Sequence, residues 1–328
     1  MVHPRTRKFA VYGGAGVGIF GAVGIGGLAG VMWGEAKLAE RRIPRAVDPP
    51  PVSHDTTWTA RGVSRYGRPV RLAMLGDSTA AGYGADVDRE TPAAQVALGI
   101  SAACRRPVHV TNVAVVGAES HDLPAQLEAL GTTDPDLAII MIGANDVTEL
   151  TKPAIAVPFL EDVVERLRER GAEVVVGTCP DLGTIRPIAQ PLRAYVRRLS
   201  RRMAREQTVA VVRAGGRTVS LGDLLGPMFM DRRELFAPDR FHPSAEGYAE
   251  AARAVLPSAL DALGIRTKAT SASTFTTRRS KPVEKAAAQA VARPGSEVAP
   301  SETKPVTVLG GVAADGNWAR LRRRVLRR

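Results

Sequence analysis

The stretch Val70-Arg-Leu-Ala-Met-Leu-Gly-Asp-Ser78 joins a short apolar run to a glycine and two polar residues. An apolar run of this length, ended by glycine, is typical of a buried strand. In parallel sheets, the groups that bind ligands lie just beyond the carboxyl ends of the strands. We therefore expect Ser78 at a site on the edge of a parallel sheet, although Gly-Asp-Ser by itself is a common turn sequence.

Strand-length apolar runs and helical patterns alternate along the chain up to about residue 266. The predicted strands are Val70–Leu75, Val108–Val113, Leu137–Ile142, Val174–Thr178 and Val209–Val212. The predicted helices are Pro92–Ala103, Leu123–Leu130, Pro158–Arg170, Pro191–Arg205 and Ser244–Leu263. Strands separated by helices indicate a parallel sheet covered on both faces. We therefore predict an α/β fold, a three-layer α/β/α sandwich, over residues 69–266.

Three other segments stand where such a sheet would bring them close to Ser78. Gly117 closes a loop after the second strand, Asn145 follows the third, and Asp239-Arg-Phe-His242 precedes the last helix. The Asp-x-x-His spacing lets one loop supply an imidazole and the carboxylate that orients it. Taken singly, these residues could be turn formers or helix caps. Together they predict a nucleophile (Ser78), a general base with its orienting acid (His242 and Asp239), and oxyanion donors on Gly117 and Asn145.

The four segments resemble, in order, the four sequence blocks of the SGNH/GDSL hydrolases, spread over roughly residues 70–263. The sequence departs from the family pattern at Thr79, where many members carry leucine, and at Ala114, where a glycine often stands. Neither change removes a catalytic group. The resemblance implies a flavodoxin-like sheet of five parallel strands and a reaction that needs no cofactor. In the reaction that it implies, the Ser78 N–H is a third oxyanion donor. The ends of the chain are similar to those of exported actinobacterial members.

A serine esterase that works through an acyl-enzyme is the function that these residues predict. The motifs do not specify the substrate. The segments 147–157 and 180–190 are short, so we expect an open site for short-chain or accessible acyl esters, such as O-acetylated glycans or small lipid esters. A long-chain lipase or phospholipase is one alternative. A catalytically inactive binding or scaffold protein tethered to the envelope is an alternative of a different class.

The formal net charge of +12 lies at the two ends of the chain. Residues 1–45 carry +5 and residues 267–328 carry +9, which leaves about −2 on residues 46–266. A near-neutral body gives little support for nucleic-acid binding. The histidines are scattered and the two cysteines show no metal-ligand spacing, so no metal site is predicted. Cys104 and Cys179 should lie at opposite edges of the sheet and be free thiols.

The sequences of the N-terminal and C-terminal segments predict contacts outside the folded domain. After a basic N-terminus (residues 1–8), residues 9–33 carry no charge and are long enough to span a bilayer. We predict an uncleaved membrane anchor there, with the hydrolase domain outside the cytoplasm; a cleaved export signal, giving a secreted protein, and a soluble segment are the alternatives. Residues 34–68 are a predicted linker. Residues 267–328 are a predicted disordered basic tail, whose short amphipathic helix at 317–328 would dock on anionic lipid or a cell-wall polymer; a merely solubilising tail is the alternative.

Overall fold

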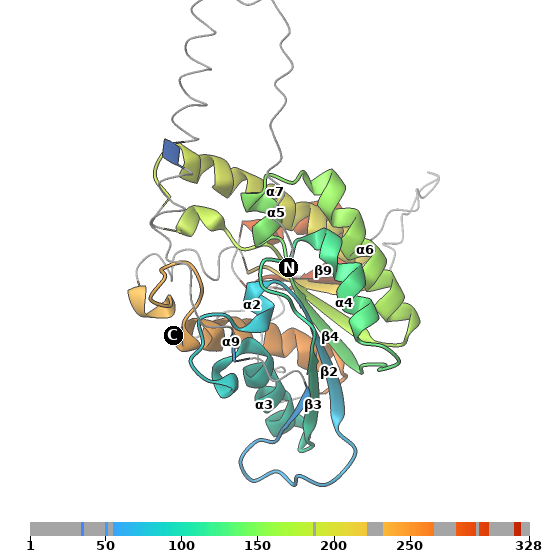
Figure 1. Cartoon of the computed structure of the whole chain (residues 1–328). Helices are drawn as coiled ribbons and strands as arrows, with labels where there is room; N and C mark the ends of the chain where they lie inside the picture. Colours follow the sequence, from blue (N-terminus) through green and yellow to red (C-terminus); the bar gives the residue numbers. More distant parts are fainter. Residues whose placement is uncertain are drawn as a thin grey trace, which may run out of the picture.

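The computed structural model describes residues 34–35, 50–51, 55–185, 188–221, 232–265, 280–292, 295–301 and 318–322. Within these residues the predicted α/β sandwich is confirmed, because one sheet lies between two layers of helices (Figure 1). The strands are β1 (Asp55–Trp58), β2 (Val70–Gly76), β3 (Val108–Asn112), β4 (Leu137–Met141), β5 (Glu173–Gly177), β6 (Arg217–Val219), β7 (Lys281–Pro282), β8 (Glu297–Pro300) and β9 (Trp318–Arg322). Their order across the sheet is β1-β3-β2-β4-β5-β6-β8-β9-β7.

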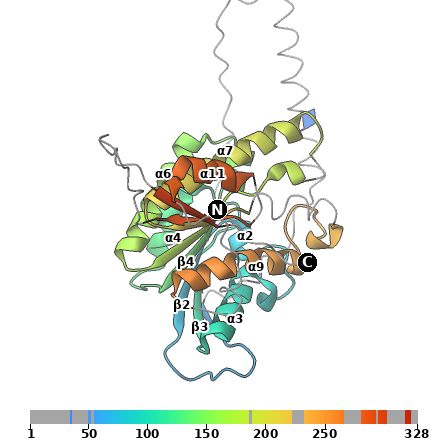
Figure 2. The same cartoon turned by 180° about the vertical axis from the view of Figure 1, so that it is seen from behind.

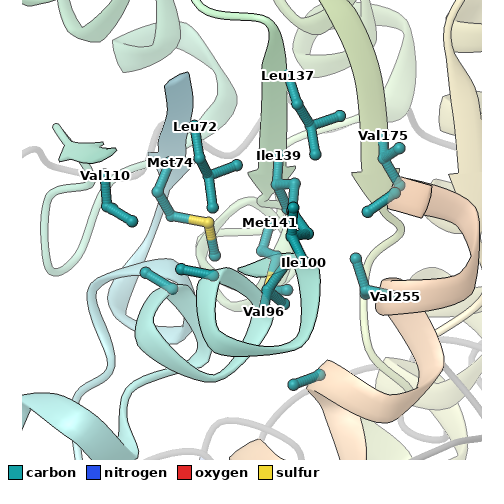
Figure 3. Packing of buried hydrophobic residues seen from close by; sticks show 14 of the residues in the cluster. Leu72, Met74, Val96, Ile100, Val110, Leu137, Ile139, Met141, Val175 and Val255 are labelled. Atoms are coloured by element: carbon teal, nitrogen blue, oxygen red, sulfur yellow. The ribbon is translucent and has the colours of Figure 1, made fainter. Parts of the chain in front are cut away.

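The central strands β3, β2, β4, β5 and β6 are parallel to one another, as expected. Alternate residues of these strands fill two separate cores. Met74 and Ile139 belong to one core, whereas Leu75 and Ile140 belong to the other. Figure 3 shows the first core, where Met74 and Ile139 meet side chains of two helices. Burial on both faces explains why the strands are continuous apolar runs.

Helices cover both faces of the sheet. On one face lie α3 (Pro92–Cys104) and α9 (Ala245–Ala262), which pack against each other. On the other lie α4 (Leu123–Ala129), α6 (Pro153–Glu169) and α7 (Leu192–Arg213), and α11 (Val283–Val291) packs against α7 (Figure 2). Two very short helices follow strand ends, α2 (Ser78–Ala81) and α5 (Ala144–Thr148). The 3-10 helices are Ser120–Asp122, Asp88–Glu90, Leu182–Thr184 and Arg233–Leu235.

The predicted fifth strand was misplaced. Val209–Val212 is the last part of α7, and the strand is β6, four residues further on. Residues 210–212 are all buried in the helix, each in a different apolar cluster. A run of four apolar residues fits a buried helix as well as a strand, so its length could not separate the two. Gly215, at φ +82°, makes the turn between α7 and β6.

The predicted disordered tail is wrong for the described part of residues 267–328. Residues 280–292 and 295–301 contain β7, α11 and β8. Of the predicted helix at 317–328, the described residues Trp318–Arg322 form the strand β9 instead. Ala319 and Leu321 are buried against α11 and β8, while Arg320 between them is exposed. Alternate burial is the strand pattern. Leu321, one of the apolar side chains expected to face lipid, therefore faces the protein.

The predicted linker at 34–68 is also partly wrong, because β1 lies within it and pairs antiparallel with β3. The predicted membrane anchor at 9–33 lies outside the described residues. Among the residues that are described, no helix has the length and apolar character needed to cross a membrane. Cys104 ends α3 and Cys179 follows β5, and both are free cysteines.

Candidate active site

Ser78 is the first residue of α2, directly after the carboxyl end of β2. The tight exit from the strand depends on Gly76, which has φ +133° and lies against β4. A Cβ added at Gly76 would lie 1.9 Å from the Met141 carbonyl oxygen, so only glycine fits. The Asp77 carboxylate then caps α2 by accepting from the Thr79 N–H at 2.9 Å. Strand, glycine and cap together fix the position of the serine.

The loop before α9 brings Asp239 and His242 to this serine. Nε2 of His242 is 3.1 Å from the Ser78 Oγ, and Nδ1 is 2.6 Å from Asp239 Oδ2. Asp239 Oδ1 also accepts from the backbone N–H groups of Phe241 (2.9 Å) and His242 (3.0 Å). Arg240, between Asp239 and Phe241, has φ +58°, which tightens the loop. The structure thus joins the three predicted residues through two successive hydrogen bonds.

The two buried carboxyls next to the serine have opposite properties. Burial alone would raise the pKa of Asp239, but hydrogen bonds from the His242 ring and the loop N–H groups hold it below its usual value. Burial raises the pKa of Asp77 to about 6, although the Thr79 hydrogen bonds lower it in part. Asp239 is therefore ionised at neutral pH and can stabilise a positive charge on the imidazole.

Two aromatic rings contact the imidazole of His242. The Tyr83 and Phe241 rings meet the imidazole edge-on, with centroids 4.4 Å and 4.8 Å away. The buried Tyr248 hydroxyl donates to the Tyr83 carbonyl at 2.6 Å, which ties α9 to the segment after α2. These contacts limit the orientations that the imidazole can adopt. Sequence reasoning missed all three aromatic residues, and only their closeness to the Ser78 and His242 motifs could have drawn attention to them.

The predicted oxyanion donors lie at the ends of the neighbouring strands. Gly117 has φ +83°, and no atom lies within 4 Å of where its Cβ would be, so its position faces open space. The Asn145 amide Nδ2 donates to the Ala118 carbonyl at 2.8 Å. The Val115 N–H donates to the Gly76 carbonyl at 3.0 Å, which holds this loop beside β2. The structure therefore brings both donor segments to the same sheet edge as Ser78.

Two glutamines that the sequence did not single out hold the backbone at this edge. Gln126 accepts from the Gly76 N–H at 2.7 Å and donates to its carbonyl at 2.9 Å. Gln207 joins the Cys179 N–H (2.8 Å) to the Ile142 carbonyl (3.1 Å). Both side chains are buried. In the described part of the chain, no cluster of three His, Cys, Asp or Glu side chains could hold a metal ion.

A serine held by an imidazole that a carboxylate orients, next to two candidate oxyanion donors, has the geometry of a serine hydrolase site. Residues 74–250 match the GDSL-like lipase/acylhydrolase family. The chain is 44% identical, over 246 residues, to the GDSL-like esterase Rv1075c of Mycobacterium tuberculosis, covering 72% of this chain and 78% of the relative. The chain therefore belongs to the GDSL-like lipase/acylhydrolase family and is a carboxylic ester hydrolase.

Two solved structures are similar over part of the chain. An acetylxylan esterase from Geobacillus stearothermophilus is 20% identical, with a TM-score of 0.47, over 62% of this chain and 98% of that one. TesA is 21% identical, with a TM-score of 0.46, over 59% of this chain and 99% of that one.

Proposed function

We propose that the protein hydrolyses esters by nucleophilic catalysis, with Ser78 as nucleophile, His242 as general base and Asp239 as the acid that orients it. The observation that carries this proposal is the unbroken pair of hydrogen bonds, 3.1 Å from Ser78 Oγ to His242 and 2.6 Å from His242 to Asp239. The first distance lies within the range required for a nucleophile and its base, and the second is that of a hydrogen bond between the base and its orienting acid.

The reaction proceeds in two stages. His242 takes the Ser78 proton as Oγ attacks the ester carbonyl, and the resulting imidazolium is stabilised by the ionised Asp239. The imidazolium then gives this proton to the departing alcohol, which leaves an acyl group on Oγ. Water attacks the acyl-enzyme with His242 again as base, and the acid is released with Ser78 restored. No cofactor enters either stage.

The negative oxygen that forms in each stage needs donors. We assign this role to the N–H groups of Ser78 and Gly117 and to the Asn145 amide. The Ser78 N–H is at the first turn of α2, where a helix provides no internal acceptor. The Asn145→Ala variant should lower kcat by roughly 10²–10³ with little change in KM, because the donor is needed most in the transition state. An increased KM with an unchanged kcat would make Asn145 a substrate-binding residue instead.

Short-chain or accessible acyl esters are the substrates we favour. Gly117 faces open space, and only four residues separate the end of α5 at Thr148 from the start of α6 at Pro153. A connection this short cannot fold over the serine as a large lid. O-acetylated glycans and small lipid esters are both chemically suitable, because each presents its ester at an exposed position.

Exposed apolar side chains favour longer acyl groups as a second candidate. Val115 and Val116 are 53% and 45% exposed next to Gly117, and Leu150, just after α5, is 55% exposed. Apolar side chains at such positions can cover an alkyl chain and remove it from water. Hydrolysis of p-nitrophenyl acetate and of p-nitrophenyl palmitate would separate the two candidates, and turnover of neither ester would favour an inactive binding protein.

The Ser78→Ala variant tests the mechanism itself. We expect ester turnover below about 1% of the original, with unchanged circular dichroism and melting temperature, because only the attacking oxygen is lost. His242→Ala should be about as severe, and Asp239→Ala somewhat milder. The matched control is Ser64→Ala, which removes an exposed hydroxyl remote from the site. Turnover that survives in Ser78→Ala would rule out this serine as the nucleophile.

A further inference from the structure

Ser120 and Asp146 form a buried pair next to the predicted oxyanion donors. Ser120 donates to Asp146 through its backbone N–H, at 3.1 Å from each carboxylate oxygen, and through its hydroxyl, at 3.0 Å from Oδ2. Each residue is 1% exposed. Because two donors of one residue meet one buried carboxylate, the two segments that carry them are held at a fixed separation.

Each member of this pair is close in the chain to a predicted donor. Asp146 directly follows Asn145 in α5, and Ser120 lies three residues after Gly117. A second hydrogen bond crosses between the same segments, from the Asn145 amide to the Ala118 carbonyl at 2.8 Å. The loop that carries Gly117 and the helix that carries Asn145 are therefore joined at two adjacent points.

The bond between Asn145 and Ala118 leaves one donor available. A side-chain amide nitrogen carries two hydrogens, so one can be held by the Ala118 carbonyl while the other points to a substrate oxygen. The direction of the second hydrogen then depends on the position of that carbonyl. Ser120, two residues further along the chain, is the residue that attaches this backbone to α5.

We propose that Ser120 and Asp146 are positioning residues of the oxyanion hole. The pair sets the direction of the Asn145 amide relative to the Gly117 N–H, and it acts through Ala118 rather than by touching the substrate. This inference rests on the proposed ester hydrolysis. A donor that is fixed before the reaction needs no reorientation when the negative charge forms, and this is what makes such donors effective.

The environment of Asp146 agrees with this role. Burial raises the pKa of the Asp146 carboxyl, and the N–H and hydroxyl of Ser120 oppose this effect. A buried carboxylate is retained only with such donors, because leaving it without them is costly. Loss of the Ser120 hydroxyl should therefore loosen the pair as a whole and not only one bond.

The test compares Ser120→Ala with a matched control, Thr151→Val, whose hydroxyl bonds to Glu119 next to Ser120. Thr151 Oγ1 donates to Glu119 Oε2 at 2.8 Å, so Thr151→Val also removes one hydroxyl–carboxylate bond, but not the bond next to Asn145. With p-nitrophenyl acetate as substrate, we expect Ser120→Ala to lower kcat about tenfold with KM unchanged. The free energy of a hydrogen bond to a charged group corresponds to a rate change of about this size. Thr151→Val should keep the original kcat. An equal loss in both variants would overturn the proposal in favour of general loop rigidity.

A double-variant cycle identifies the route of the effect. If Ser120 acts through Asn145, then Ser120→Ala should cause no further loss when it is added to Asn145→Ala. The same tenfold loss in both backgrounds would contradict the proposal.

Asp146→Asn, which keeps one acceptor oxygen for Ser120, provides a second variant in case Ser120→Ala fails to fold, and it should also lower kcat rather than raise KM. Turnover that survives in Ser78→Ala would instead contradict the proposed function, so the two failures can be told apart.

Discussion

Asp77 is buried directly before the predicted nucleophile, and burial raises its pKa to about 6. An ordinary aspartate in the unfolded chain has a pKa near 3.9. As the pH rises from about 4 to about 6, the unfolded chain has already lost this proton while the folded protein still holds it, so stability falls. Above pH 6 the loss is complete, at about 3 kcal/mol. The ionised carboxylate also attracts a positive charge on His242.

Asp77→Asn should therefore raise the melting temperature at pH 8 by several degrees and change it little at pH 4. Asparagine caps a helix as well as aspartate does, so α2 should keep its start. The kcat should decrease, because the charge that attracts the imidazolium is lost. Thermal melts between pH 4 and 8 measure the effect, with the exposed Asp86→Asn as control. A lower melting temperature at pH 8 would show that the negative charge itself holds the fold.

The two thiols should differ in reactivity. Burial raises the pKa of Cys179 well above its usual value, and the carboxylates of Asp146, Asp77 and Asp181 raise it further. The thiolate is the reactive form, so native Cys179 should resist iodoacetamide at pH 8, whereas the partly exposed Cys104 should react. Mass spectrometry of alkylated native and unfolded protein checks this. A disulfide between the two cysteines would contradict their placement at opposite edges of the sheet.

At the scale of the elements, the buried Glu297 of β8 forms ion pairs with both neighbouring strands. Glu297 is fully buried and pairs with Arg217 of β6 at 3.2 Å and with Arg322 of β9 at 3.8 Å. Arg322 also pairs with Asp261 of α9, the helix that follows the His242 loop. These pairs join the strands beyond β6 to the layer that supports the site.

Glu297→Gln should therefore destabilise the protein by about 2–4 kcal/mol, because it leaves two arginines without their shared buried partner. The matched control is Glu284→Gln, which breaks the exposed pair with Arg213 at 2.7 Å and should cost less than about 1 kcal/mol. Urea unfolding measures both values. Equal effects would mean that Glu297 contributes no more than a surface ion pair.

The sequence predicts helices and strands best where its pattern fits only one of the two. Leu137–Ile142 and Val174–Thr178 are apolar runs of strand length, and both are strands with nearly the predicted bounds. Val209–Val212 fits either element, and packing against the sheet decides for helix. Ser78, Asp239 and His242 were predictable because their spacing is itself a chemical pattern. Ser120 was not, because its role arises only from a contact with a residue 26 positions away.

At the scale of the whole molecule, the composition of the C-terminal segment led to a wrong prediction. Residues 267–328 are rich in Ser, Thr, Ala, Pro and basic residues, which predicts disorder. Yet Val283, Ala286 and Ala290 of α11 are buried against Val298 and Leu321 of the added strands. Small apolar residues give a weak signal along the chain, and they become a core only when helix and strands meet. This extension lies outside the family match at 74–250, and it lengthens the sheet beyond its parallel part.

Removal of residues 280–328 should consequently damage the fold and not merely shorten a tail. The truncation exposes the edge of β6, which pairs with β8 through Thr218 and Val219, and it uncovers the apolar side of α7 around Val212. An uncovered strand edge next to apolar surface favours aggregation. We expect little soluble protein, and a melting temperature lower by roughly 10 °C or more in whatever remains soluble. The control ends the chain after Arg322, which removes basic residues but keeps β9, and it should melt as the full chain does.

Turnover per folded molecule should be similar in both variants, since none of the predicted catalytic residues lies beyond residue 279. Full solubility and an unchanged melting temperature after truncation at 279 would show that the extension packs on the sheet without stabilising it.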